Sequence, residues 1–193
     1  MQYGLQMYSV RDVAQGDLLG TLEKVGKLGY HYAEFAGFFG IPAEDVKAKL
    51  DECGMEVSST HTGWQELTDD QITETIKYHK TIGNSFIIIP GADLSDQKKL
   101  DDFIELVNKV QPVLAAEGIK LGYHNHSHEF KTNEDGSKDG HGTPLGMGTA
   151  PAAQVYKTAK EMGIQMIVES ETCTPSGLEE ARICIEFLKA QEA

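Results

Sequence analysis

Five short hydrophobic runs follow the same local pattern, in which an amphipathic stretch ends at a glycine and the apolar run comes next. The glycines are Gly29, Gly54, Gly83, Gly118 and Gly163. A glycine in this place is typical of a helix that ends in a left-handed residue before a strand begins. The runs are apolar almost without interruption, as in parallel strands that are buried on both faces. Together with an apolar run at the start of the chain, they predict six strands that alternate with helices.

The predicted strands cover residues 4–10, 32–36, 56–61, 85–90, 119–124 and 165–170. Helices are predicted after each of them, and Pro42, Pro151 and Pro175 stand near three helix starts, where proline is well tolerated. Thr68 and Gln71 form an S/T-x-x-E/Q capping box, which predicts the start of the third helix. Apolar residues that repeat at helical spacing are expected to face inward. This expected inward set includes Ile104, Val155 and Met162.

The alternation stops between about residues 127 and 149, where the chain is rich in Gly, Asn, Asp and Thr and has no apolar period. An irregular loop of this length inside a compact domain indicates a lid, a disordered segment or missing structure. The 193 residues suit one domain, 1–193, interrupted by this loop. They are few for an eight-stranded (β/α) barrel, which typically needs about 250.

Composition narrows the classes of function. The net charge of −13 argues against nucleic-acid binding, which depends on clustered Lys and Arg, and the only arginines are Arg11 and Arg182. No apolar run approaches the roughly 20 residues that cross a bilayer. The first residues lead directly into a predicted strand, so we expect no signal peptide. Cys53, Cys173 and Cys184 are an odd number without CxxC spacing, as expected for buried thiols in a reducing compartment. We therefore expect a cytoplasmic protein without membrane partners.

Polar residues gather where the predicted strands end. They are Glu34, His61, His124, His126, Glu169 and Glu171. The carboxyl ends of the strands form the catalytic face of a (β/α) barrel. The sequence thus predicts an α/β fold, a TIM-barrel-like (β/α) fold shortened to about six βα units. His79, on the third helix, is expected at the surface.

Several motifs carry a family resemblance. LQMYSVRD in the first strand, YAEFAG in the second, STH in the third, GYHNHSHEF after the fifth and IVESE near the end resemble the sugar phosphate isomerase/epimerase family of xylose-isomerase-like TIM barrels. Members of that family are longer, and residues 137–140 (SKDG) resemble a remnant of their seventh-strand motif. The resemblance thus implies an internal deletion that includes the sixth strand.

The resemblance also implies a divalent metal, held at the ends of strands five to eight. Only His124 and Glu169 match those ligand positions, and two ligands would hold Mn²⁺, Mg²⁺, Zn²⁺ or Co²⁺ weakly or not at all. Glu129, Asp139 or His141 from the long loop are candidate replacement ligands. With a metal bound, the cation would polarise a carbonyl and flanking carboxylates would move a proton on the adjacent carbon.

Candidate roles follow for individual residues. Glu169 and Glu129 are the candidate proton-transfer groups. The alternative role for Glu169 is structural, as a buried carboxylate paired with Lys138 or a histidine. The candidate substrate-binding residues are Glu34, His61, Trp64, His126 and Lys138. Trp64 either stacks on a sugar face or contacts a lid. Histidines at strand ends, such as His61 and His124, often have only a structural role.

Two functions remain open on the sequence alone. One is metal-assisted isomerisation or epimerisation of a small carbohydrate. The other is a catalytically inactive carbohydrate-binding or assembly protein that has lost the metal site. An endonuclease IV-like DNA repair enzyme is disfavoured by the charge and the missing ligands. Because a shortened barrel leaves open parallel edges, we also expect a homo-oligomer.

Overall fold

The computed structural model describes residues 1–124, 144–148 and 151–192, so most of the predicted irregular loop lies outside the described residues. The chain divides into two compact units. Unit 1 comprises Met1–Ser58 and Gly140–Ala193, and unit 2 comprises Ser59–Asp139. The single domain predicted from the sequence stays a prediction.

Unit 1 is built around a central parallel strand. Its elements are β1 (Tyr3–Gln6), η1 (Met7–Val10), α1 (Arg11–Ala14), α2 (Leu18–Leu28), β2 (Tyr32–Phe35), α3 (Ala43–Cys53), the first part of β3 (Glu56–His61), α6 (Ala152–Glu161), β6 (Met166–Val168) and α7 (Gly177–Ala190). β1 pairs in parallel with β2 on one side and with β6 on the other, and Gly4 is opposite both Tyr32 and Ile167. A Cβ on Gly4 would lie 2.3 Å from Ile167 Cδ1. The glycine therefore makes room for the side chain of the neighbouring strand.

Helix α2 shows how local sequence sets the packing of unit 1. The Asp17 side chain caps the helix by accepting from Gly20 N at 2.8 Å, and the helix ends at Gly29, whose φ of 104° is left-handed. Between these ends, Leu18, Leu22 and Val25 are buried on one face. This face contributes to a core that β1 and β2 also line.

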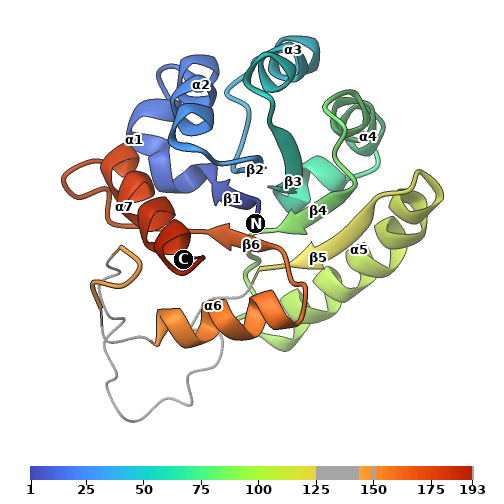
Figure 1. Cartoon of the computed structure of the whole chain (residues 1–193). Helices are drawn as coiled ribbons and strands as arrows, with labels where there is room; N and C mark the ends of the chain where they lie inside the picture. Colours follow the sequence, from blue (N-terminus) through green and yellow to red (C-terminus); the bar gives the residue numbers. More distant parts are fainter. Residues whose placement is uncertain (125–143, 149–150, 193) are drawn as a thin grey trace. The chain divides into compact units, whose positions relative to one another are not determined.

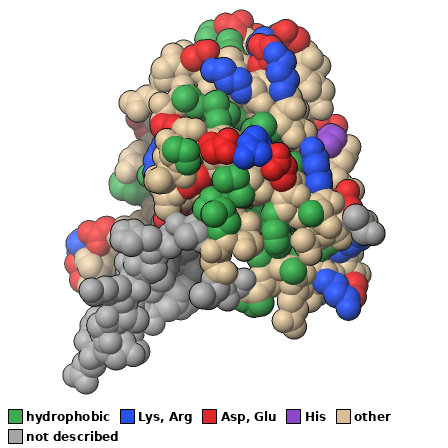
Figure 2. All heavy atoms as spheres, turned by 60° about the vertical axis from the view of Figure 1, so that its left-hand side comes forward, with side chains coloured by type: hydrophobic (Ala, Val, Ile, Leu, Met, Phe, Trp, Pro, Cys, Tyr) green, Lys and Arg blue, Asp and Glu red, His purple; other side chains and the backbone are tan. Residues whose placement is uncertain are grey.

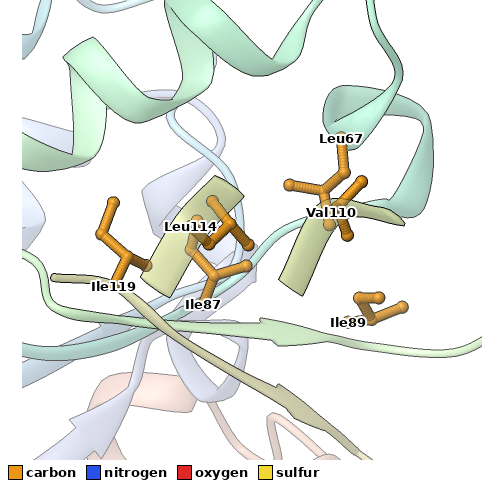
Figure 3. Close-up of a cluster of buried hydrophobic side chains, with 6 residues drawn as sticks. All are labelled: Leu67, Ile87, Ile89, Val110, Leu114 and Ile119. Carbon is orange, nitrogen blue, oxygen red and sulfur yellow. The ribbon is translucent and has the colours of Figure 1, made fainter. Parts of the chain in front are cut away.

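Unit 2 has a second hydrophobic core. Its elements are the end of β3, η2 (Trp64–Leu67), α4 (Ile72–Thr81), β4 (Phe86–Ile89), α5 (Gln97–Ala116) and β5 (Lys120–Tyr123), and β4 pairs in parallel with β3 and β5. Side chains from η2, β4, α5 and the residue just before β5 form the cluster drawn in Figure 3. The cluster consists of Leu67, Ile87, Ile89, Val110, Leu114 and Ile119.

Strand β3 is shared by the two units. Its first residue donates a hydrogen bond from Glu56 N to His31 O (2.9 Å) in unit 1, and its last residues, Thr60 and His61, pair with β4 in unit 2. The strand order is therefore β5-β4-β3-β2-β1-β6, with helices between successive strands (Figure 1). The prediction of a TIM-barrel-like α/β fold with about six βα units is confirmed.

Three local predictions were wrong. The first strand ends at Gln6, and Met7–Val10 turn into a 3₁₀ helix because the Gln6 side chain accepts from Tyr8 N. The Thr68 hydroxyl does not cap a helix but donates to Gln65 O and Asp70 Oδ1, so α4 begins at Ile72. Ile104, Val155 and Met162 are exposed, because α5 and α6 turn neighbouring residues such as Val110 and Tyr156 inward instead.

The surface carries both signs of charge. Figure 2 shows acidic and basic side chains interspersed with apolar ones on the face it draws. No helix in the described part of the chain is long and apolar enough to cross a membrane.

Candidate functional site

A buried amide–carboxylate pair lies at the carboxyl ends of β1 and β2 in unit 1. Gln6 Nε2 donates to Glu34 Oε1 at 2.8 Å, and Gln6 Oε1 accepts from Tyr8 N at 2.9 Å. Gln6 is fully buried, and Glu34 is only 8 % exposed. Because a buried carboxylate is costly unless it is hydrogen-bonded, the amide both stabilises Glu34 and fixes its position. Glu34, predicted to bind substrate, is thus held as an acceptor at a strand end.

Two predicted histidines come together in unit 2. His61 ends β3 and His124 directly follows β5, and their ring centroids are 4.8 Å apart at an interplanar angle of 54°. The backbone of His124 is fixed by its N–H, which donates to Ile89 O at 2.9 Å. Both residues are half-buried. The two imidazoles therefore lie next to each other at the carboxyl ends of β3 and β5, where the sequence predicted that polar residues gather.

Trp64 lies three residues beyond β3, at the start of η2. It lines a pocket of about 360 Å³ whose described lining residues all belong to unit 2. The other lining residues are Ala92, Asp93, Lys99, Asp102, Phe103 and Leu106. The indole is therefore part of a concave surface near the carboxyl ends of β3 and β4.

Glu169 follows β6 and is exposed, which contradicts the expected buried carboxylate. The next residue, Ser170, is buried instead, and its N–H donates to Ser9 Oγ at 2.8 Å. Arg11 fixes the same loop, because its guanidinium donates to Glu171 O (2.5 Å) and Tyr8 O (2.9 Å). Glu169 is thus an accessible carboxylate on a well-held turn.

A second buried carboxylate of unit 1 is Glu180, on α7, which the sequence analysis missed. It is fully buried and accepts from Ser170 Oγ (2.6 Å), Cys173 N (3.0 Å) and Thr174 N (3.1 Å), and also from the Thr172 hydroxyl. All four donors are neutral and belong to the loop between β6 and α7. Glu180 therefore acts as the organising centre of the loop that begins with Glu169.

Cys173, in the same loop, has an unfavourable backbone conformation that a contact with Glu180 stabilises. Its backbone is left-handed, with φ of 51°, a conformation that is unfavourable for a residue with a side chain. The hydrogen bond from Cys173 N to Glu180 is one of the contacts that compensate for this cost. The loop shape therefore depends on a helix residue outside it.

The other predicted site residues cannot be placed. Glu129, His126 and Lys138 lie outside the described residues, as do the candidate replacement ligands Asp139 and His141. Of the two predicted metal ligands, His124 belongs to unit 2 and Glu169 to unit 1. Among residues 1–124, 144–148 and 151–192, no three His, Cys, Asp or Glu side chains are grouped so that they could hold a metal ion. The described side chains therefore do not by themselves fit a divalent-metal centre.

His79 was wrongly expected at the surface, since it is only 1 % exposed. Its Nδ1 is 2.7 Å from the Thr75 carbonyl oxygen, which can only accept, so Nδ1 carries the proton. Nε2 then accepts from the hydroxyls of Thr60 (2.9 Å) or Thr62 (3.2 Å). Asn84 Nδ2 also donates to Thr60 Oγ1. The result is a buried polar network next to the end of β3. This network stabilises the neutral form of the His79 ring.

From this network we predict that the stability of unit 2 decreases at acid pH. Burial lowers the pKa of His79 below its ordinary value of 6.5, although the bond to Thr75 O partly opposes the shift. Between the lowered pKa of His79 in the folded protein and its ordinary pKa of about 6.5 in the unfolded chain, the unfolded chain binds more protons than the folded one. The contribution of neutral His79 to stability is therefore complete above about pH 6.5 and is lost as the pH falls. Urea unfolding followed by Trp64 fluorescence from pH 8 to 5 should show this loss. In His79→Gln the decline below pH 6.5 should become shallower, and an unchanged pH slope would contradict the assignment.

Comparison with known proteins identifies the fold. No protein-family model matches the chain, and no curated protein matches it. Two solved sugar phosphate isomerase/epimerase structures from Parabacteroides distasonis match it at 19 % and 20 % identity, with TM-scores of 0.76 and 0.72. The first match covers 96 % of each chain, and the second covers 98 % of this chain and 93 % of the other.

A third structure is D-psicose 3-epimerase with D-tagatose from Clostridium cellulolyticum H10, at 15 % identity, TM-score 0.64, and coverage of 98 % of this chain and 99 % of that one. At these identities the likeness concerns the fold. The chain therefore shares the TIM-barrel-like fold of these isomerase and epimerase structures, and the resemblance seen in the sequence motifs is confirmed at the level of the fold.

Proposed function

We propose that this protein is a sugar isomerase/epimerase-like protein that binds a small carbohydrate at the carboxyl ends of its strands. The observation that carries the proposal is the Gln6–Glu34 pair, a buried carboxylate held in place at the end of the sheet where barrel enzymes bind their ligands. A sugar presents many hydroxyl donors, and a fixed carboxylate accepts from them more strongly than a neutral group does.

The proposed chemistry is proton transfer at the carbon next to a carbonyl. Glu169 is the proposed base in unit 1, because it is an exposed carboxylate on a loop that Glu180 and Arg11 hold in shape. Glu129 remains the second proposed proton-transfer group. A divalent metal, when bound, would polarise the carbonyl. The described residues form no three-ligand group for such a metal, so the proton transfer is assigned to the carboxylates.

The experiment measures binding and proton exchange separately. Aldoses, ketoses and their phosphates are titrated calorimetrically, and exchange of the proton next to the carbonyl is followed by NMR in D₂O, with and without Mn²⁺. Glu34→Gln should weaken binding about 10-fold or more, because a hydrogen bond to a charged group contributes about 1.5–3 kcal/mol. Glu44→Gln, an exposed carboxylate on α3, should leave binding unchanged. Absence of carbohydrate binding, or equal binding by both variants, would overturn the proposal.

The second candidate is an inactive carbohydrate-binding protein. It is favoured by the lack of a three-ligand metal group among the residues that the structure describes. The same experiment separates the two. Saturable sugar binding that depends on Glu34, without proton exchange at any Mn²⁺ concentration, would assign the binding protein. Exchange that Glu169→Gln abolishes would assign the enzyme.

A further inference from the structure

The Trp64 pocket has rigid aromatic walls. Phe103, on α5, packs edge-on against Tyr123 of β5, with ring centroids 5.7 Å apart at 64°. The short helix that carries Trp64 is anchored by Leu67, which is buried in the core of unit 2, and by Thr75 Oγ1, which donates to Glu66 O at 2.7 Å.

The indole of Trp64 is partly accessible. The residue is 39 % exposed, which is high for a tryptophan that lines a cavity next to Phe103 and Leu106. Four of the seven lining residues that the structure describes are apolar, so the pocket offers an apolar contact surface. Its volume of about 360 Å³ is at the lower end of the range of small-molecule sites. A single ring with one small substituent is of the right size.

The charged rim of this pocket is acidic. Lys99 Nζ donates to Asp93 Oδ2 at 2.7 Å and to Ser95 Oγ at 2.9 Å, so its charge is already matched by a carboxylate. This contact lowers the pKa of Asp93 to about 2, and the group is ionised at neutral pH. Asp102, also on the rim, pairs with Lys98 outside the lining. Among the described lining residues, an incoming phosphate would therefore meet two carboxylates and one ammonium group, each of them already paired.

We propose that the Trp64 pocket binds an uncharged sugar ring bearing an apolar substituent, and excludes phosphorylated groups. The proposal rests on the proposed function and defines its substrate class. The C–H face of a sugar and an apolar group would stack on Trp64 and Phe103, while ring hydroxyls would donate to Asp93 or Asp102. The chemistry of the rim thus favours a glycoside over a sugar phosphate.

The single tryptophan of the chain gives a direct test. The indole N–H resonance of Trp64 is followed by ¹H–¹⁵N NMR while matched methyl and phenyl hexopyranosides and the hexose 6-phosphates are added. The phenyl glycosides should shift this resonance saturably and bind about 10-fold tighter than the methyl glycosides, as expected for a ring stacked on aromatic walls. The hexose phosphates should leave it in place. Equal affinities for phenyl and methyl glycosides, or a saturable shift with the phosphates, would overturn the proposal.

Variants distinguish binding at this pocket, in unit 2, from binding at the Gln6–Glu34 pair, in unit 1. Trp64→Ala should abolish the preference for phenyl glycosides in calorimetric titrations, whereas Trp64→Phe should keep part of it. Phe39→Ala removes another exposed aromatic ring, in unit 1, and should change nothing. If sugars perturb the signals of Gln6 and Glu34 but not of Trp64, the pocket proposal fails and the proposed function stands. If no carbohydrate perturbs either set of signals, both fail.

Discussion

Replacement of Glu180 by alanine is expected to lower the free energy of unfolding by on the order of 3 kcal/mol, and by more if the loop cannot rearrange. The change leaves two hydroxyls and two backbone N–H groups without their common acceptor at a fully buried position. A buried donor without a partner costs about 1–3 kcal/mol, and of these four hydrogen bonds the one from Ser170 is buried and the other three are partly buried. Entry of water and movement of the loop would recover part of that sum.

Two further variants make the test specific. Glu186→Ala removes an exposed carboxylate from the same helix, where it only pairs with Arg182, and should change stability by about 0.5 kcal/mol or less. Glu180→Gln keeps the volume but offers one acceptor and two extra donors to a site that contains only donors, so it should also be strongly destabilising. Urea unfolding followed by circular dichroism measures all three. Similar stabilities for Glu180→Ala and Glu186→Ala would show that the network contributes nothing.

The Glu180 network also connects stability to the proposed site. The loop that it organises starts directly after Glu169, and its first buried residue is Ser170. A loop that loses four hydrogen bonds would present Glu169 in many positions instead of one. Stability and proton transfer should therefore fall together in Glu180→Ala, which marks Glu180 as a positioning residue.

Most of the fold could be predicted from the sequence because its signals are local. A glycine at the end of a helix followed by a continuous apolar run needs no distant partner, and the strand at Glu56–His61 was predicted at its observed bounds. The first strand was drawn too long because Met7–Val10 are as apolar as a strand. The contact that turns them, from Tyr8 N to Gln6 Oε1, is a side-chain effect that no apolar pattern reveals.

The candidate site was predictable only where it lies at strand ends. Glu34, His61 and His124 follow from that rule, and the last two meet as neighbouring rings. Glu180 and His79 are on helices, where polar residues usually face solvent. Both nevertheless stand in apolar stripes, since Glu180 is four residues from Cys184 and His79 three from Ile76. A polar residue inside such a stripe was the available signal for a buried network.

Removal of side-chain volume from the core of unit 2 should have an effect as large as that of Glu180→Ala. Leu114 is fully buried and belongs to the cluster of Figure 3, together with Ile87 and Ile119. Leu114→Ala should therefore cost about 3 kcal/mol, from lost apolar burial and from the cavity that the rigid surroundings leave unfilled. With a urea dependence of about 2 kcal/mol per M, the unfolding midpoint should fall by roughly 1.5 M.

The preceding residue supplies the matched control. Val113 is on the same helix but is 43 % exposed, so Val113→Ala deletes apolar volume without opening a buried cavity and should stay within about 0.5 kcal/mol of the parent. Trp64 fluorescence reports on unit 2 in both variants, because the indole lies on η2, whose Leu67 belongs to the same cluster. Equal midpoints for the two variants would mean that the cluster does not stabilise unit 2. A loss confined to Leu114→Ala would show that burial in this cluster stabilises unit 2.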